Sequence, residues 1–86
     1  MNYRLSKHAV EELRLRQIPR DLLESVMQNP QQVVLERGGK KAYQSQLAFG
    51  GGRVFLLRAI VDDAIAPAMV VTVYRTKKIG KYWRKS

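Results

Sequence analysis

The sequence predicts an α+β fold, with two N-terminal helices packed on one face of a roughly four-stranded antiparallel sheet. Three observations support this fold class. Apolar residues recur at helical spacing in the first third of the chain, and from about residue 31 they alternate with polar residues. Glycine, proline and aspartate residues separate four alternating segments. Helices followed by consecutive strands are typical of α+β domains.

The first helix is expected over residues 7–16, after a short extended segment at residues 2–5. Ser6 is a suitable N-cap, because its hydroxyl can accept a hydrogen bond from a free backbone N–H of the first turn. Val10 and Leu13 are three residues apart and are expected on one face. The helix is therefore predicted to be capped and amphipathic.

The second helix is expected over residues 20–28. Pro19 suits the first turn of a helix, because its φ is fixed near the helical value and its missing N–H is not needed there. Pro30, which follows an asparagine, ends the helical pattern. Two apolar pairs four residues apart indicate the buried face: Leu22 with Val26, and Leu23 with Met27.

Four strands are expected after Pro30, because the period of the apolar residues changes to two. The segments "RGGKK", "GGG" and "DDAIAP" separate them and have the composition of turns. The strands are predicted at residues 31–36, 41–49, 53–61 and 68–75.

Alternation also assigns side chains to the two faces of the sheet. Arg58 interrupts the most apolar strand, and Thr72 and Tyr74 are expected beside it on the face without helices. The opposite, helix-packed face is predicted to carry Met69, Val71 and Val73 together with Phe55, Leu57, Ala59 and Val61.

Composition limits the classes of protein. A chain of 86 residues fits one domain, which we place at residues 1–75, with residues 76–86 as its basic C-terminal segment. There is no cysteine and one histidine, so disulfides, thiolate nucleophiles and zinc sites of cysteine or several histidines are excluded. No metal or cofactor is therefore expected. No segment resembles a signal peptide or membrane span, so we expect a cytoplasmic protein without a membrane partner.

The charge of the chain favours a polyanionic partner. Sixteen Lys and Arg oppose seven Asp and Glu, for a formal net charge of +9. Six of these cations and none of the acids lie in residues 75–85, where interleaved aromatic side chains can stack on bases. A solvated basic end, or a docking surface for an acidic protein, remains an alternative. The predicted RNA-binding residues of this segment are Arg75, Lys77, Lys78, Lys81, Tyr82, Trp83 and Arg84.

His8 is a candidate catalytic residue, because histidine is the side chain whose unperturbed pKa lies near neutral pH. It lies in the first turn of the first expected helix, beside Lys7. The positive end of the helix dipole favours the neutral imidazole, which suits a general base. The alternative interpretation is a surface or half-buried histidine that only packs at the start of the helix.

Arg58 is the second candidate, since an arginine in an apolar strand needs an exposed face or a paired carboxylate. Cleavage of RNA by an internal 2′-hydroxyl needs a base, a cation at the phosphate and a proton donor for the leaving oxygen. His8, Arg58 and Tyr74 could supply these groups. The alternative is an ordinary strand with polar residues on its outer side.

Four segments follow one another over roughly residues 4–75: "SKHAVEELRLRQI", "VMQNPQQVV", "GKKAYQSQL" and "MVVTVY". This order of motifs resembles the small bacterial family known as domain of unknown function 4258. The family is similar in layout to the BrnT and RelE toxins, which cleave RNA without a metal and pair with an antitoxin. The resemblance therefore implies a ribonuclease-type fold with helices before an antiparallel sheet.

The same resemblance implies particular site residues. The Lys-His of the family motif falls on Lys7 and His8, and its closing Thr and Tyr fall on Thr72 and Tyr74. Two positions depart from the family pattern, because Glu12 stands where an arginine is usual and Gln17 where a glycine is usual. The phosphate-binding arginine of the first helix would then be Arg14 or Arg16.

These observations lead to one hypothesis and one alternative. The hypothesis is a metal-independent endoribonuclease, the toxin of a bacterial toxin–antitoxin pair, which cleaves RNA by 2′-hydroxyl attack. RNA and an acidic antitoxin protein encoded nearby are the expected partners, and a homo-oligomer is left open. The alternative is a non-enzymatic small basic module that binds nucleic acid or a partner protein.

Overall fold

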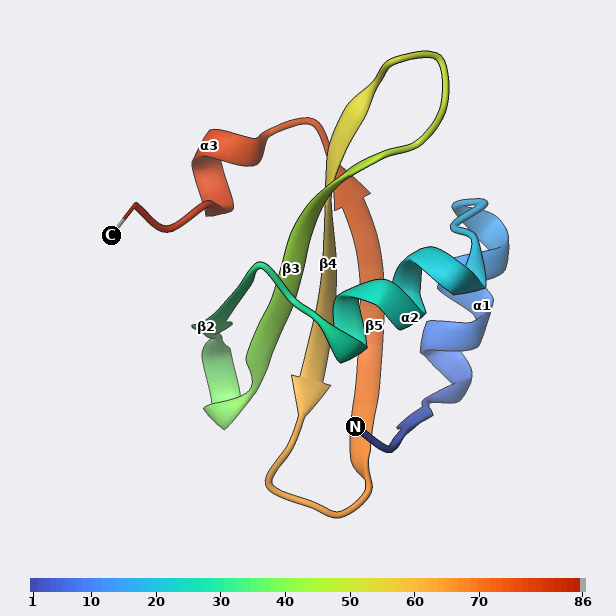
Figure 1. Cartoon of the computed structure of the whole chain (residues 1–86). Helices are drawn as coiled ribbons and strands as arrows, with labels where there is room; N and C mark the ends of the chain where they lie inside the picture. The colour runs from blue at the N-terminus through green and yellow to red at the C-terminus, as the bar shows by residue number, and fades with distance from the viewer. Residues whose placement is uncertain (86) are drawn as a thin grey trace.

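The computed structural model describes residues 1–85 and has one five-stranded mixed sheet of order β1-β5-β4-β3-β2. Helices α1 and α2 lie over the same face of this sheet (Figure 1). None of the helices in residues 1–85 is long and apolar enough to cross a bilayer. The elements are β1 (Tyr3–Leu5), α1 (Lys7–Leu15), α2 (Arg20–Gln28), β2 (Gln32–Leu35), β3 (Lys41–Ala48), β4 (Val54–Asp62), β5 (Ala68–Thr76) and α3 (Ile79–Tyr82).

The α+β class is confirmed, but the prediction of four antiparallel strands is wrong. The expected extended segment before the first helix is a fifth strand, β1, which pairs in parallel with β5. Tyr3 lies opposite Ala68, and Leu5 lies opposite Val70. A strand of three residues is too short to show alternation, and its partner is more than sixty residues away in the chain, so local sequence does not reveal the pairing.

The predicted N-cap of α1 is confirmed. The Ser6 hydroxyl accepts a hydrogen bond from the Ala9 N–H at 2.9 Å, and it donates one to the Val71 carbonyl at 2.7 Å. Ala9 and Leu13, four residues apart, face the core. Val10 was expected beside Leu13 but is 43% exposed, because the helix face that packs on the core carries Ala9 and Leu13 instead.

Replacing Ser6 with alanine is expected to lower the free energy of unfolding by about 1–2 kcal/mol, since both the cap and the bond to β5 are lost. Urea denaturation measures this loss. Ser25→Ala is the matched control, because Ser25 is an exposed residue within α2 and its change should stay within about 0.5 kcal/mol. Equal midpoints for the two variants would contradict the capping role.

The core lies between the two helices and β3, β4 and β5. The apolar pairs predicted for α2 point into it, with Leu23, Val26 and Met27 buried and Leu22 packed at its margin. The apolar face predicted for β4 is confirmed by the burial of its central residues. The strand side of the core is formed by Tyr43, Leu57, Ala59, Val61, Ala68, Val70 and Val73.

A β-bulge changes the faces of β5. The register between β4 and β5 shifts between Ile60 and Val61, which leaves Val71 without a partner directly opposite. The prediction that Met69 and Val71 face the helices is therefore wrong, because one extra residue reverses the alternation on its N-terminal side. The β5 residues buried against the helices are Ala68, Val70 and Val73.

Candidate functional site

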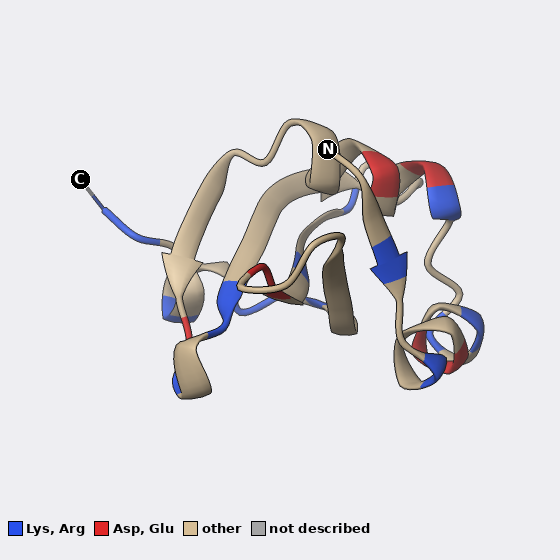
Figure 2. Cartoon of the chain, turned by 90° about the horizontal axis from the view of Figure 1, so that it is seen from below, with Lys and Arg blue, Asp and Glu red and all other residues tan. Residues whose placement is uncertain are grey.

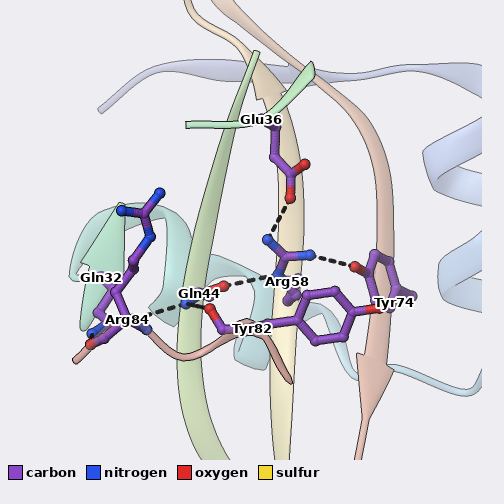
Figure 3. A network of polar contacts seen from close by, with 7 residues as sticks. All are labelled: Gln32, Glu36, Gln44, Arg58, Tyr74, Tyr82 and Arg84. Atoms are coloured by element: carbon purple, nitrogen blue, oxygen red, sulfur yellow. Dashed lines mark hydrogen bonds and ion pairs between the residues drawn. The ribbon is translucent and has the colours of Figure 1, made fainter. Parts of the chain in front are cut away.

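The C-terminal segment, residues 77–85, lies across the face of the sheet that α1 and α2 leave uncovered (Figures 1 and 3). Two glutamine side chains hold its backbone. Gln32 donates to the Arg84 carbonyl at 2.6 Å and accepts from the Arg84 N–H at 3.1 Å. Gln44 donates to the Tyr82 carbonyl at 3.2 Å. The face that was expected to be open is therefore partly covered by the chain's own basic segment.

Arg58 lies beneath this segment and is 3% exposed. Its Nε donates to Gln44 Oε1 at 2.8 Å, and its two terminal nitrogens donate at 2.5 Å to the Tyr74 hydroxyl and to Glu36 Oε1. The guanidinium carbon lies 4.2 Å from the centre of the Tyr82 ring, within range of a cation–π interaction (Figure 3). We call these five residues the Arg58 network.

Strand register explains why the network forms. Gln44 and Tyr74 lie directly opposite Arg58 on the two neighbouring strands, so all three side chains project from the same face. Glu36 follows β2 and supplies the carboxylate that a buried arginine requires. Within residues 1–85, no buried side-chain nitrogen or oxygen lacks a hydrogen-bond partner. The guanidinium is therefore held in a fixed orientation.

The two tyrosines of the network differ in acidity. Burial raises the pKa of the Tyr74 phenol above its usual value, although the neighbouring Arg58 acts in the opposite direction. The pKa of the Tyr82 phenol is lowered, mainly by a hydrogen bond with Tyr74 and also by the positive charge of Lys81. The ring centres are 6.2 Å apart. The pKa values of the two phenols are thus displaced in opposite directions.

His8 is not part of this arrangement. It lies on α1, on the helix-covered side of the sheet, where its side chain is 63% exposed and its Nε2 is 3.8 Å from Glu12 Oε1. Arg58 and Tyr74 project from the opposite face. The structure therefore does not bring these three residues together, because α1 packs on the core face whereas alternation turns Arg58 away from it. Lys7 is exposed on the same helix.

The predicted phosphate-binding arginines of α1 are both paired with acids of their own helix. Arg14 forms an ion pair with Glu11, and Arg16 Nε lies 3.3 Å from Glu12. Glu12, where the resemblance led us to expect an arginine, thus contacts both Arg16 and His8. This acid places negative charge between the two residues that were expected to bind phosphate and to act as a base.

The remaining predicted RNA-binding residues are divided between the two sides of the sheet. Thr72 lies opposite Ile60, on the same face as Arg58, and Lys81 lies over the Tyr82 ring. Arg75 contacts phenylalanine rings on the helix side. Figure 2 shows basic and acidic residues intermixed on the two N-terminal helices, whereas the segment toward the C terminus carries basic ones alone. Lys77, Lys78, Trp83 and Arg84 belong to that segment.

Sequence analysis missed Gln32, Glu36 and Gln44. A signal for Gln44 was present, because it occupies the strand position that pairs with Arg58 in an in-register hairpin. Glu36 could have been found by asking which acid near the sheet can neutralise a buried arginine. No signal pointed to Gln32, whose partner Arg84 is 52 residues away.

Among residues 1–85, no three histidine, aspartate or glutamate side chains are grouped closely enough to hold a metal ion. A family model described as "Domain of unknown function (DUF4258)" matches residues 5–75. This match includes Glu36, Gln44, Arg58 and Tyr74 and ends before Tyr82. No curated protein and no solved structure matches the chain. Because the match covers most of the sequence, the chain belongs to the DUF4258 family.

Proposed function

We propose that the protein is a metal-independent endoribonuclease, the toxin of a toxin–antitoxin pair, and that RNA is cleaved at the Arg58 network. The observation that carries this proposal is a guanidinium in contact with two tyrosines whose pKa values are displaced in opposite directions. This arrangement offers a base, an acid and a fixed positive charge within one cluster, which are the groups that phosphodiester cleavage requires.

The chemistry divides among three side chains. The Tyr82 phenolate accepts the proton of the ribose 2′-hydroxyl, and the 2′-oxygen attacks the adjacent phosphorus. The bond from phosphorus to the 5′-oxygen breaks, and the Tyr74 phenol donates its proton to that oxygen. Arg58 stabilises the negative charge that grows on the phosphate. The products are a 2′,3′-cyclic phosphate and a free 5′-hydroxyl, and no metal enters the reaction.

Access to Arg58 requires a small movement of the C-terminal segment, because the arginine is 3% exposed and lies under the Tyr82 ring. The segment is held by hydrogen bonds to Gln32 and Gln44 and by the contacts of Tyr82 with Arg58 and Tyr74, and none of its residues belongs to the hydrophobic core. In our proposal the segment moves far enough to admit a phosphate to the guanidinium while Tyr82 stays beside Tyr74. Its lysines and arginines would remain close to the phosphates of the incoming RNA.

Replacing Tyr82 with phenylalanine is expected to slow cleavage of single-stranded RNA by about 100-fold or more, the usual contribution of a general base. In the parent protein the rate should rise with pH until the lowered pKa of Tyr82 is passed, because the base acts when deprotonated. The variant should lose this rise. Product analysis in excess EDTA measures both effects.

Tyr43→Phe is the matched control for this experiment. The Tyr43 hydroxyl contacts Asp63 at 3.2 Å, and its ring lies in the core on the helix side. This variant should cleave at the parent rate. If Tyr82→Phe and Tyr43→Phe cleave equally well, the proposed base is wrong.

His8→Ala is expected to leave the cleavage rate unchanged, because His8 and the Arg58 network lie on opposite sides of the sheet. The same cleavage assay measures this. A large loss of rate would instead show that RNA reaches the helix side during the reaction. His8 would then again be a candidate catalytic residue.

A second candidate function is RNA binding without cleavage, and the burial of Arg58 favours it. The guanidinium is already neutralised by Glu36, and each of its three nitrogens donates one hydrogen bond within the network. In this case the parent protein binds single-stranded RNA and produces no 2′,3′-cyclic phosphate. If the protein purifies with a small acidic protein encoded beside its own gene, the toxin proposal is supported. The similarity in layout to BrnT and RelE is part of that proposal.

A further inference from the structure

A hollow of about 510 Å³ lies on the helix side of the sheet, beyond the C-terminal end of α1. Its walls come from the end of α1, the start of β4 and the end of β5. It is separate from the Arg58 network, because successive residues of β5 point to opposite faces: Tyr74 contacts Arg58, whereas Arg75 lines the hollow. The residues that matter below are Leu15, Arg16, Phe55, Arg75 and Lys77.

The hollow has an excess of positive charge. Within residues 1–85, no carboxylate lies within ion-pair distance of Arg75 or Lys77. Arg16 is paired with Glu12, with Nε 3.3 Å from the carboxylate. An anion entering the hollow therefore meets two cations without an ion pair and a third that is paired with an acid.

The hollow also has apolar walls. Leu15 lines the hollow and is 61% exposed, although it is a large hydrophobic residue. Phe55 also lines it and packs edge to face on Phe49, with ring centres 5.4 Å apart. The Arg75 guanidinium carbon lies 5.1 Å from the centre of the Phe55 ring, and Lys77 Nζ lies 5.7 Å from it. A base that stacks on Phe55 therefore takes the place of a cation over the ring, and that cation is then close enough to reach a phosphate.

We propose that this hollow binds single-stranded nucleic acid, with one base packed between Phe55 and Leu15 and its neighbouring phosphates bound by Arg75, Lys77 and Arg16. Aromatic stacking combined with unpaired cations is how proteins bind single strands without reading their sequence. An acidic peptide would use the cations but not the ring. The choice of RNA as the ligand rests on the proposed function, whereas the site itself does not depend on cleavage.

The test measures binding of a fluorescent ten-nucleotide 2′-O-methyl oligouridylate, which lacks the attacking hydroxyl and is not cleaved, to the full chain by anisotropy at several salt concentrations. Phe55→Leu keeps an apolar side chain at this position but removes the ring, and it should weaken binding by at least about fivefold. Arg75→Gln should weaken binding and also reduce the slope of log affinity against log salt by about 0.7, the value for one lost contact with a single strand. Arg4→Gln is the matched control, since Arg4 is exposed on the edge strand β1 and has no ion pair among the described residues.

The site is supported if both variants bind more weakly than Arg4→Gln while their thermal midpoints show that they remain folded. It is overturned if Arg75→Gln and Arg4→Gln bind equally, or if the parent protein does not bind the oligonucleotide. It is also overturned if polyglutamate competes as well as RNA and Phe55→Leu does not change that competition, because the partner is then an acidic protein. Cleavage that depends on Tyr82 would survive equal binding by Arg75→Gln and Arg4→Gln and would survive competition by polyglutamate, so the two proposals can fail separately. A parent protein that does not bind the oligonucleotide would contradict both.

Discussion

Replacing Arg58 with methionine is expected to lower the free energy of unfolding by about 3 kcal/mol, near the lower end of the range for breaking a buried ion pair. The variant removes the donor for Glu36, Gln44 and Tyr74 together. The Glu36 side chain is 29% exposed, so water will replace part of its lost interaction, and the upper end of the range is not expected. Chemical denaturation of the parent and variant measures the difference.

Arg53→Met is the matched control, because Arg53 is exposed in the turn before β4 and should change stability by no more than about 0.5 kcal/mol. A second variant distinguishes the cost of the unpaired Glu36 carboxylate from the cost of the lost Arg58 packing. If the uncompensated carboxylate is the main cost, then Glu36→Gln added to Arg58→Met should recover part of the lost stability. Equal stability of Arg58→Met and Arg53→Met would show that the network contributes nothing to the fold.

The parts of the fold that depend on neighbouring residues could be predicted from the sequence. The second helix has its expected bounds, since a proline before it and an apolar pair spaced by four are local signals. The turn at residues 50–52 was expected because three consecutive glycines are a local turn signal. In the structure all three adopt positive φ values. Alternation also placed Arg58 and Tyr74 on one face, which was enough to find the centre of the candidate site.

The parts that depend on distant residues could not be predicted. Alternation assumes an unbroken strand, and a single bulge near Val71 reversed the faces of the residues before it. The parallel pairing of β1 depends on a strand at the other end of the chain. Most important for function, the basic segment was expected to be free for RNA, whereas Tyr82 and Arg84 dock onto Gln44 and Gln32. Polar contacts of this kind leave no periodic pattern in the sequence.

Ending the chain after Thr76 is expected to slow RNA cleavage by about 100-fold or more, even though it uncovers Arg58. The variant loses Tyr82, the proposed base, and gains access to the arginine. The fold should persist, because none of residues 77–85 belongs to the core, with a loss of about 1–2 kcal/mol for the hydrogen bonds to Gln32 and Gln44. Circular dichroism and the cleavage assay measure the two effects.

Gln32→Leu is the comparison variant for the truncated chain. It removes both hydrogen bonds to Arg84 and so loosens the segment, and it also removes an acceptor of Gln44, but it leaves Tyr82 in the chain. If Tyr82 is the base and the segment must move for RNA to enter, Gln32→Leu should cleave at least as fast as the parent protein, whereas the truncated chain should be nearly inactive. If both variants cleave faster, the segment only covers Arg58 and the base lies elsewhere. Loss of activity in both would mean that the docked position of the segment is the active one.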